Sequence, residues 1–245
     1  MSAFFQSNVP RIVASFSGSA TAAQIARLQR SACDMVELRV DLYPSWGIDR
    51  VLKEIQRFSP TPTLATIRSN AEGGEWHGTE AARLSMLQEI IPHVSAVDVE
   101  LSSETILSEV IKTARNAGTA VLLSYHAFGP MPSVDVLSDI LKRAEAAGAD
   151  LTKIAVMVQG RDDLMRLARF TIDHADRPIA VLGMGEGGVP SRLLFPALGS
   201  RLTYAYIGRP TAPGQWAYDE MTRLFARLYH DRPQDPPSTR RRTEP

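Results

Sequence analysis

The chain has 245 residues, of which 44% are hydrophobic and 22% charged, with 27 basic and 27 acidic side chains. This apolar content supplies a hydrophobic core and excludes a disordered chain, and the zero net charge disfavours nucleic-acid binding, which needs a basic face. No apolar run reaches the roughly 18 residues of a membrane span, and the N-terminus lacks the basic region of a signal peptide. We therefore expect a soluble cytoplasmic protein without nucleic-acid or membrane partners.

Eight short apolar runs alternate with amphipathic segments along the chain. The expected strands are 12–16, 35–40, 63–67, 96–101, 120–125, 151–157, 179–184 and 202–207. The expected helices are 21–32, 48–58, 79–91, 103–117, 134–147, 162–174 and 215–228. Strands that are apolar almost throughout are typical of a parallel sheet covered on both faces. The pattern predicts a single-domain (β/α)8 TIM barrel, with a doubly wound open sheet as the alternative.

Two segments depart from this alternation. We assign residues 1–230 to the barrel and expect the tail 231–245 to be disordered, because it is rich in proline and arginine and poor in apolar residues. The connection after the third expected strand contains Gly73, Gly74 and Gly78, and its composition permits a lid over a site.

Three common chemistries are disfavoured by the residues present. Cys33 is the only cysteine, which excludes an internal disulfide and favours a reducing compartment. It could be a nucleophile, but a small helical cysteine is more often a packing residue. No cluster of His, Cys and carboxylates has metal-ligand spacing, and no G-x-S-x-G elbow is present. We expect neither a metal nor a serine hydrolase.

Polar side chains interrupt the apolar runs at the carboxyl ends, where a barrel places its chemistry. Burying a charge without a partner costs several kcal/mol, so such groups are kept as ion pairs or for function. In chain order they are Ser15, Glu37, Arg39, Arg68, Glu100, His126 and Lys153, with Met184 closing the seventh run. Together with Arg192, these arginines could bind carboxylate or phosphate groups.

Lys153 is the most informative of these residues, because its neighbours in LTKIAVMV are almost all apolar. It could be a structural ion-pair partner of Glu37 or Glu100. Alternatively, desolvation and nearby arginines would lower its pKa and leave a neutral amine that condenses with a ketone or aldehyde. His126, one strand earlier, would then lie beside it as a general acid–base group. His77, in the glycine-rich connection, is a weaker competitor for that role.

These residues predict a barrel enzyme that uses Lys153 as an imine-forming nucleophile on an anionic carbonyl substrate, with aldol cleavage and elimination both open. The loop 183–188 follows the seventh expected strand, where many barrels bind phosphate. Glu186 within that loop argues against a phosphate site, and the glycine pattern is only a weak dinucleotide-binding signal.

An ordered set of segments resembles the type I 3-dehydroquinase family. The matching segments are ELRVDL at 37–42, TIRSNAEGGE at 66–75, VDVEL at 97–101, SYHAF at 124–128, ADLTKIAVM at 149–157, GMGEGGVPSR at 183–192, GSRLTYAY at 199–206 and APGQ at 212–215. They occur in family order and span about residues 11–229. No single segment is decisive, but the ordered set is highly specific.

The resemblance implies that Lys153 forms a Schiff base with the C3 carbonyl of 3-dehydroquinate. His126 would remove the C2 proton and donate a proton to the departing C1 hydroxyl, so that syn elimination of water yields 3-dehydroshikimate. This product belongs to the shikimate pathway of aromatic amino-acid biosynthesis, with quinate breakdown as the alternative role. Glu72 would orient His126, and Arg192 would bind the substrate carboxylate. The other implied substrate-binding residues are Ser15, Glu37, Leu38, Arg39, Arg68, Met184, Thr211 and Gln215. No metal or other cofactor is implied, and dimers are common in the family.

Three positions depart from the commoner family pattern: Ala127 follows the histidine in place of an acidic residue, Thr211 replaces a frequent serine, and Leu182 replaces a methionine of some members. None of them removes a group that the chemistry requires. An aldolase acting on a phosphorylated sugar would explain Lys153 but not the APGQ or EGG segments. A non-catalytic sensor of the same ligand would have no need for both Lys153 and His126.

Overall fold

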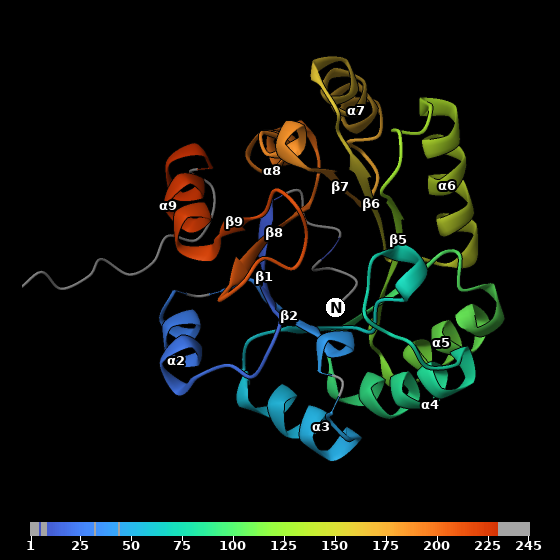
Figure 1. The fold of residues 1–245 in the computed structure, drawn as a ribbon, viewed down its shortest axis with the longest axis vertical. Coiled ribbons are helices and arrows are strands. Elements are labelled where there is room, and N and C mark those ends of the chain that lie inside the picture. Colours follow the sequence, from blue (N-terminus) through green and yellow to red (C-terminus); the bar gives the residue numbers. More distant parts are fainter. Residues whose placement is uncertain (1–4, 6–8, 32, 44, 230–245) are drawn as a thin grey trace, which may run out of the picture.

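The computed structural model describes residues 5, 9–31, 33–43 and 45–229, and the predicted disordered tail 231–245 lies outside this range. Parallel strands line the centre of the molecule, and helices surround them (Figure 1). The strands are β1 (Arg11–Phe16), β2 (Met35–Arg39), β3 (Thr63–Thr66), β4 (Ala96–Glu100), β5 (Ala120–Ala127), β6 (Leu151–Met157), β7 (Ile179–Met184) and β8 (Leu202–Ile207), with the two-residue β9 (Trp216–Ala217) beside β8. Their order is β7-β6-β5-β4-β3-β2-β1-β8-β9. The predicted single-domain TIM barrel is thus confirmed.

The barrel closes through a seam between β7 and β8 rather than through a continuous ladder. These two strands pack against each other, and the Arg201 backbone N–H donates to the Ile179 carbonyl at 2.8 Å. The hydroxyl of Ser200 accepts from the Val181 N–H at 2.9 Å. At Val181 the backbone N–H thus donates to a side-chain hydroxyl and not to a backbone carbonyl of β8.

The helices begin and end close to the expected positions. They are α2 (Ala22–Arg30), α3 (Ile48–Arg57), α4 (Glu80–Ile90), α5 (Glu104–Ala117), α6 (Val134–Ala147), α7 (Arg161–Asp173) and α9 (Tyr218–Leu228), together with the short α8 (Ser191–Leu194), which the sequence pattern did not predict. Thr21 and Gln24 form a capping box at the start of α2. Gly118 and Gly148 end α5 and α6 with positive φ, a conformation that glycine adopts at little cost.

Successive strand residues point to opposite faces, so the barrel has two apolar cores. The larger one lies between the strands and the helices and includes Leu38 of β2. The smaller one fills the barrel interior and includes Met184 of β7 and Tyr204 of β8. This alternation turns Glu37 and Arg39 inward, on either side of Leu38. The polar residues of the strand ends therefore meet above the inner core.

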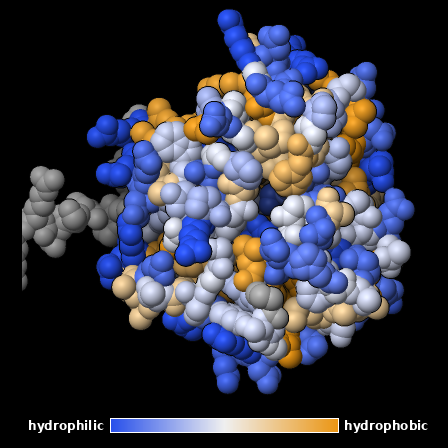
Figure 2. Space-filling view, viewed as in Figure 1, coloured by the Kyte–Doolittle hydropathy of each residue, from blue (hydrophilic) through white to orange (hydrophobic). Residues whose placement is uncertain are grey.

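On the face that Figure 2 shows, hydrophilic residues predominate and the exposed hydrophobic residues form small separate groups. Isolated apolar side chains of this kind are normal on a folded protein. In the described part of the chain, no helix has both the length and the apolar character needed to cross a membrane.

Candidate active site

A pocket opens at the carboxyl ends of the strands, where a barrel places its active site. Its lining comes from strands and loops that are far apart in sequence. The lining residues predicted from the sequence are Glu37, Arg39, Arg68, Glu72, His126, Lys153, Met184, Arg192, Thr211 and Gln215. The lining residues that the sequence did not single out as site residues are Gly73, Phe128, Ala155, Leu182, Tyr204, Ala212 and Pro213.

Lys153 lies within β6 and is only 6% exposed. Its Nζ atom donates to Asp98 Oδ2 at 3.0 Å and lies 3.9 Å from Glu37 Oε1. It also lies 4.2 Å from the centre of the Tyr204 ring, within cation–π range. Glu37 is therefore a neighbour of Lys153, as expected from the sequence. Glu100, the other expected partner, instead binds Arg68 through one carboxylate oxygen and Arg83 through the other.

The sequence pattern does not single out Asp98 as a site residue, although it lies in the VDVEL segment at 97–101. It shares the inward face of β4 with Glu100, two residues along the strand. Burial alone would raise its pKa, but the positive charges of Arg68 and Lys153 outweigh burial and hold the pKa of Asp98 well below its ordinary value. Arg68 Nη2 is 2.9 Å from Asp98 Oδ2. Asp98 therefore stays ionised and connects the arginine to the lysine.

His126 and Glu72 form the second polar group of the pocket. Glu72 Oε2 lies 2.9 Å from His126 Nδ1 and accepts from the His126 backbone N–H at 2.8 Å. Its other oxygen accepts from the Ser102 hydroxyl at 2.6 Å. Since Nδ1–H donates to the carboxylate, Nε2 is the nitrogen with a free lone pair. The connection 69–78 after β3 carries Glu72 to a histidine at the end of β5.

Burial lowers the pKa of His126 well below its usual value, and the charges of Arg68 and Lys153 add to this effect. Burial also raises the pKa of Glu72, although hydrogen bonding from Ser102 and the charge of Arg68 oppose the rise. At neutral pH the imidazole is therefore uncharged. A neutral imidazole with a free lone pair is suited to act as a general base.

Arg192 lies in α8 and is 1% exposed. Burial lowers the pKa of its guanidinium to about 10, and no carboxylate among the described residues offsets this burial. Its Nη2 donates weakly to the Pro213 carbonyl at 3.4 Å, and its Nε lacks a hydrogen-bond partner within the described structure. A buried guanidinium that lines a pocket and lacks a counter-ion is suited to bind an anion from solution.

Two of the expected substrate contacts do not line the pocket with their side chains. Leu38 packs in the core between strands and helices, because the strand alternation turns it away from Glu37 and Arg39. Ser15 lies behind the lining, where its hydroxyl donates to Glu37 Oε2 at 2.5 Å and lies 2.9 Å from the Thr211 hydroxyl. Gln215 Oε1 accepts from the Thr211 N–H at 2.7 Å. Ser15 therefore supports residues that do reach the pocket.

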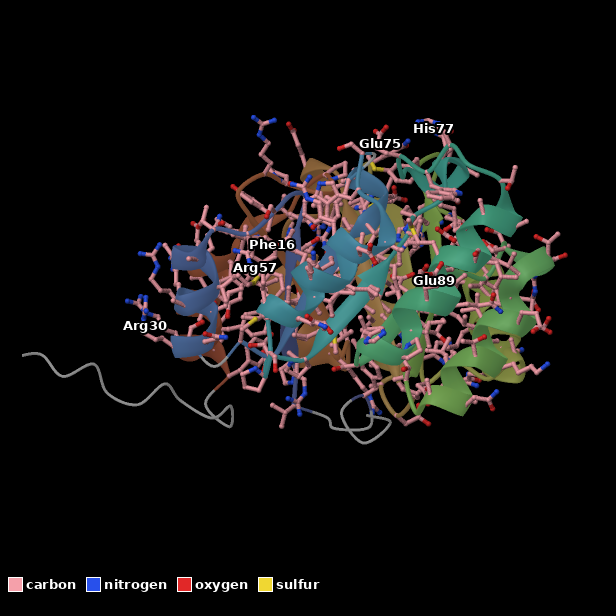
Figure 3. All side chains as sticks on the ribbon, turned by 90° about the horizontal axis from the view of Figure 1, so that it is seen from below. Phe16, Arg30, Arg57, Glu75, His77 and Glu89 are labelled. Atoms are coloured by element: carbon pink, nitrogen blue, oxygen red, sulfur yellow. The ribbon has the colours of Figure 1, made fainter. Side chains whose placement is uncertain are left out.

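The competing candidates lie elsewhere. Glu75 and His77 point outward from the connection after β3 (Figure 3), and the His77 side chain is 69% exposed. Cys33 is buried in the outer core, where its thiol donates to the Met35 carbonyl. The loop 183–188 reaches the pocket only through Met184. Within residues 5, 9–31, 33–43 and 45–229, no three His, Cys, Asp or Glu side chains form a metal-binding group.

Comparisons with known proteins agree on one family. Residues 13–232 match the family model described as type I 3-dehydroquinase. A 3-dehydroquinate dehydratase of Methanocella arvoryzae is 35% identical over 86% of this chain and 94% of its own length. The corresponding protein of Thermodesulfovibrio yellowstonii is 34% identical over 82% of this chain and 88% of its own length.

Solved structures give the same result. The type I 3-dehydroquinate dehydratase of Clostridium difficile, solved with covalent modified comenic acid, superposes with a TM-score of 0.82 at 29% identity, over 92% of this chain and 94% of that one. The 3-dehydroquinate dehydratase of Aquifex aeolicus superposes with a TM-score of 0.80 at 27% identity, over 89% of this chain and 99% of that one.

Proposed function

The chain belongs to the type I 3-dehydroquinase family of hydro-lyases, and on that premise we propose that it dehydrates 3-dehydroquinate to 3-dehydroshikimate through an imine on Lys153. One observation carries the proposal: a buried lysine, a neutral histidine and a buried arginine that has no carboxylate partner among the described residues line the same small pocket. These three groups supply a nucleophile, a base and an anchor for an anionic substrate.

Lys153 is the nucleophile of the proposed reaction. Once deprotonated, its Nζ attacks the C3 carbonyl carbon, and loss of the carbonyl oxygen as water leaves a C=N bond to the substrate. Asp98 at 3.0 Å and the Tyr204 ring hold Nζ at the pocket wall, which limits the positions that the amine has to search. The protonated imine withdraws electrons from C3 and so acidifies the neighbouring C2–H bond.

His126 moves the proton in the elimination. Its neutral imidazole takes the C2 proton, and the bonding electrons form the C2–C3 double bond of an enamine. The same imidazolium then protonates the C1 hydroxyl, which leaves as water while the enamine electrons form the C1–C2 double bond and restore the imine. Hydrolysis of that imine releases 3-dehydroshikimate and returns Lys153. Glu72, at 2.9 Å from Nδ1, stabilises the imidazolium between the two proton transfers.

The remaining polar lining residues bind the substrate in this proposal. Arg192 pairs with the carboxylate, because it is the arginine of the pocket lining that has no carboxylate partner among the described residues. Glu37, Arg39, Arg68 and Gln215 contact the hydroxyl groups, and Met184 packs beside the imine. Thr211 adds a hydroxyl, Ser15 supports it from behind, and Leu38 could contribute only through its backbone. The covalent modified comenic acid in the Clostridium difficile relative is consistent with such a pocket, since comenic acid is a small carboxylic acid.

A direct assay tests this function. Purified protein mixed with 3-dehydroquinate is expected to produce the ultraviolet absorbance of the conjugated enone of 3-dehydroshikimate. The same protein is expected to leave phosphorylated ketose and aldose sugars uncleaved. If the protein binds 3-dehydroquinate but forms no enone even at micromolar enzyme concentration, a non-catalytic sensor is favoured. Cleavage of a phosphorylated sugar would instead favour an aldolase.

The pH dependence of kcat/KM should report the lowered pKa of His126. A free histidine is half charged near pH 6.5, whereas the folded enzyme keeps this imidazole neutral to a lower pH because it is buried beside Arg68 and Lys153. The base therefore remains active as the pH falls through 6.5, and the acid limb of the kcat/KM profile should have its midpoint below that value. A midpoint at or above pH 6.5 would contradict the assignment of His126 as a neutral base.

Replacing Arg192 with methionine should raise KM by about 10- to 100-fold, since a charge-assisted pair with a carboxylate contributes about 1.5–3 kcal/mol. The protein should stay folded, because the change removes a buried charge that has no carboxylate partner in the described structure. Steady-state kinetics and thermal unfolding measure the two effects. Arg223→Met on the outer face of α9 is the matched control. An unchanged KM for Arg192→Met would show that the substrate carboxylate binds elsewhere.

A further inference from the structure

Arg83 is a fully buried arginine that lies outside the pocket and that the mechanism above does not use. It lies on α4 and is 0% exposed. Its Nη1 donates to Glu100 Oε2 at 2.6 Å and to the Ile67 carbonyl at 3.1 Å. Its Nη2 donates to the Ser103 hydroxyl and, toward the surface, to Glu80 Oε2 at 2.7 Å. One guanidinium thus connects α4 to the end of β3 and to the turn after β4.

The first branch of these contacts leads to the substrate-binding arginine. Arg83 and Ser103 bind Glu100 Oε2, while Glu100 Oε1 accepts from Arg68 Nη1 at 2.9 Å and from the Ser69 backbone N–H at 2.8 Å. Arg68 also forms an ion pair with Asp98, which in turn pairs with Lys153. Because Arg83 binds one carboxylate oxygen, Glu100 presents the other to Arg68 in a fixed direction.

The second branch leads to the histidine. Arg83 holds the hydroxyl of Ser103 in the turn between β4 and α5, and the adjacent Ser102 donates to Glu72 Oε1 at 2.6 Å. Glu72 in turn binds His126. Ser69, which Glu100 binds, begins the connection that carries Glu72. Arg83 thus contacts Ser103, the neighbour of the serine that binds Glu72, and Glu100, the residue that binds the start of the connection carrying Glu72.

We propose that Arg83 is a positioning residue for the reaction, acting through Glu100 on Arg68 and through Ser103 and Ser102 on the Glu72–His126 pair. The expected effects on kcat and KM rest on the proposed function. The expected effect on the Glu72–His126 hydrogen bond does not depend on it. The buried charges support the positioning role: without Arg83, Glu100 has Arg68 as its remaining arginine partner. Arg68 would then be drawn toward Glu100 and away from the pocket.

The test replaces Arg83 with methionine, which has a similar reach and no charge. We expect kcat/KM to fall about 10- to 100-fold, with KM raised through Arg68 and kcat lowered through His126, since a shift of about 1 Å in a reacting group can cost about 100-fold. Arg83→Lys keeps the charge but offers fewer directed donors, so it should restore part of the loss. Glu80→Gln removes only the contact toward the surface and should leave both constants unchanged.

A proton NMR measurement separates this role from a purely structural one. The His126 Nδ1–H that donates to Glu72 should give a low-field resonance, assigned by its loss in His126→Ala. Arg83→Met should broaden or shift it, and Glu80→Gln should not. If Arg83→Met does not fold, Ser103→Ala provides the same readouts, because it removes one contact of Arg83 and one of Glu100.

The outcomes separate the two proposals. An active wild type whose Arg83→Met variant keeps its kcat, KM and His126 resonance, with only thermal stability lowered, would overturn the positioning role. An inactive wild type would overturn the proposed function. In that case a changed His126 resonance in Arg83→Met would still support the positioning of Glu72 and His126, and an unchanged resonance would reject it.

Discussion

Lys153→Ala is expected to lower the turnover of 3-dehydroquinate by about 10⁴-fold or more, the scale seen when a covalent nucleophile is removed. No other lysine lines the pocket within the described structure, so no second amine can form the imine. Without the imine, the C2 proton is acidified only by a neutral ketone. The loss should therefore appear in kcat and should not be recovered at high substrate concentration.

The fold of this variant should persist. Asp98 keeps Arg68 as a partner at 2.9 Å, so removing the lysine does not leave that carboxylate unpaired. Circular dichroism and thermal unfolding check this point, and Lys142→Ala on the exposed face of α6 is the matched control, with normal activity expected. Near-normal turnover by a folded Lys153→Ala protein would remove the imine mechanism.

His126→Ala is expected to lower kcat by about 10²- to 10⁴-fold, the range typical of losing a general acid–base group. Lys153 keeps its contacts with Asp98 and Tyr204 in this variant, so the imine should still form and then accumulate. Rapid mixing with substrate followed by borohydride reduction should trap more adduct, relative to turnover, than in the wild type.

The exposed His93→Ala is the matched control for this variant and should behave as the wild type does. If His126→Ala loses imine formation together with turnover, the histidine acts before the elimination. Its assignment as the proton shuttle between C2 and the C1 hydroxyl would then be wrong.

The fold was predictable because its signal is local and repeated. Each strand of β1 to β8 is a short apolar run and most of the long helices are amphipathic, so the predicted bounds differ from the observed ones by only a few residues. The seam between β7 and β8 was not predictable. It depends on the register of the two strands, and one hydroxyl, that of Ser200, takes the place of a ladder hydrogen bond.

The site was predictable where a polar residue interrupts an apolar strand. Lys153, His126 and Glu37 stand out in this way, and the barrel rule that strand ends meet brings them together. The alternation within β2 also shows why Leu38, between two inward residues, turns away. The family resemblance alone places Leu38 among the substrate-binding residues, and the alternation of the strand argues against a contact through its side chain.

The partners of these groups were harder to predict, because a hydrogen bond between distant segments leaves no local pattern. Asp98 and Glu100 look equivalent in the sequence, yet Asp98 binds Lys153 while Glu100 binds two arginines. In the sequence Arg83 looks like an ordinary polar residue of a helix, and its burial follows from the contact of α4 with the turn after β4. Nothing in the sequence around Ser102 indicates a role in the site, because its contact with Glu72 joins two distant segments.

Borohydride trapping tests the central claim most directly. The protein is mixed with 3-dehydroquinate, reduced, digested and mapped by mass spectrometry, with Lys153→Ala treated in parallel. The account predicts a reduced adduct on the peptide that contains Lys153, absent from the variant. Wild-type protein that forms the enone product yet carries no adduct on Lys153 would contradict it, because elimination would then proceed without the imine.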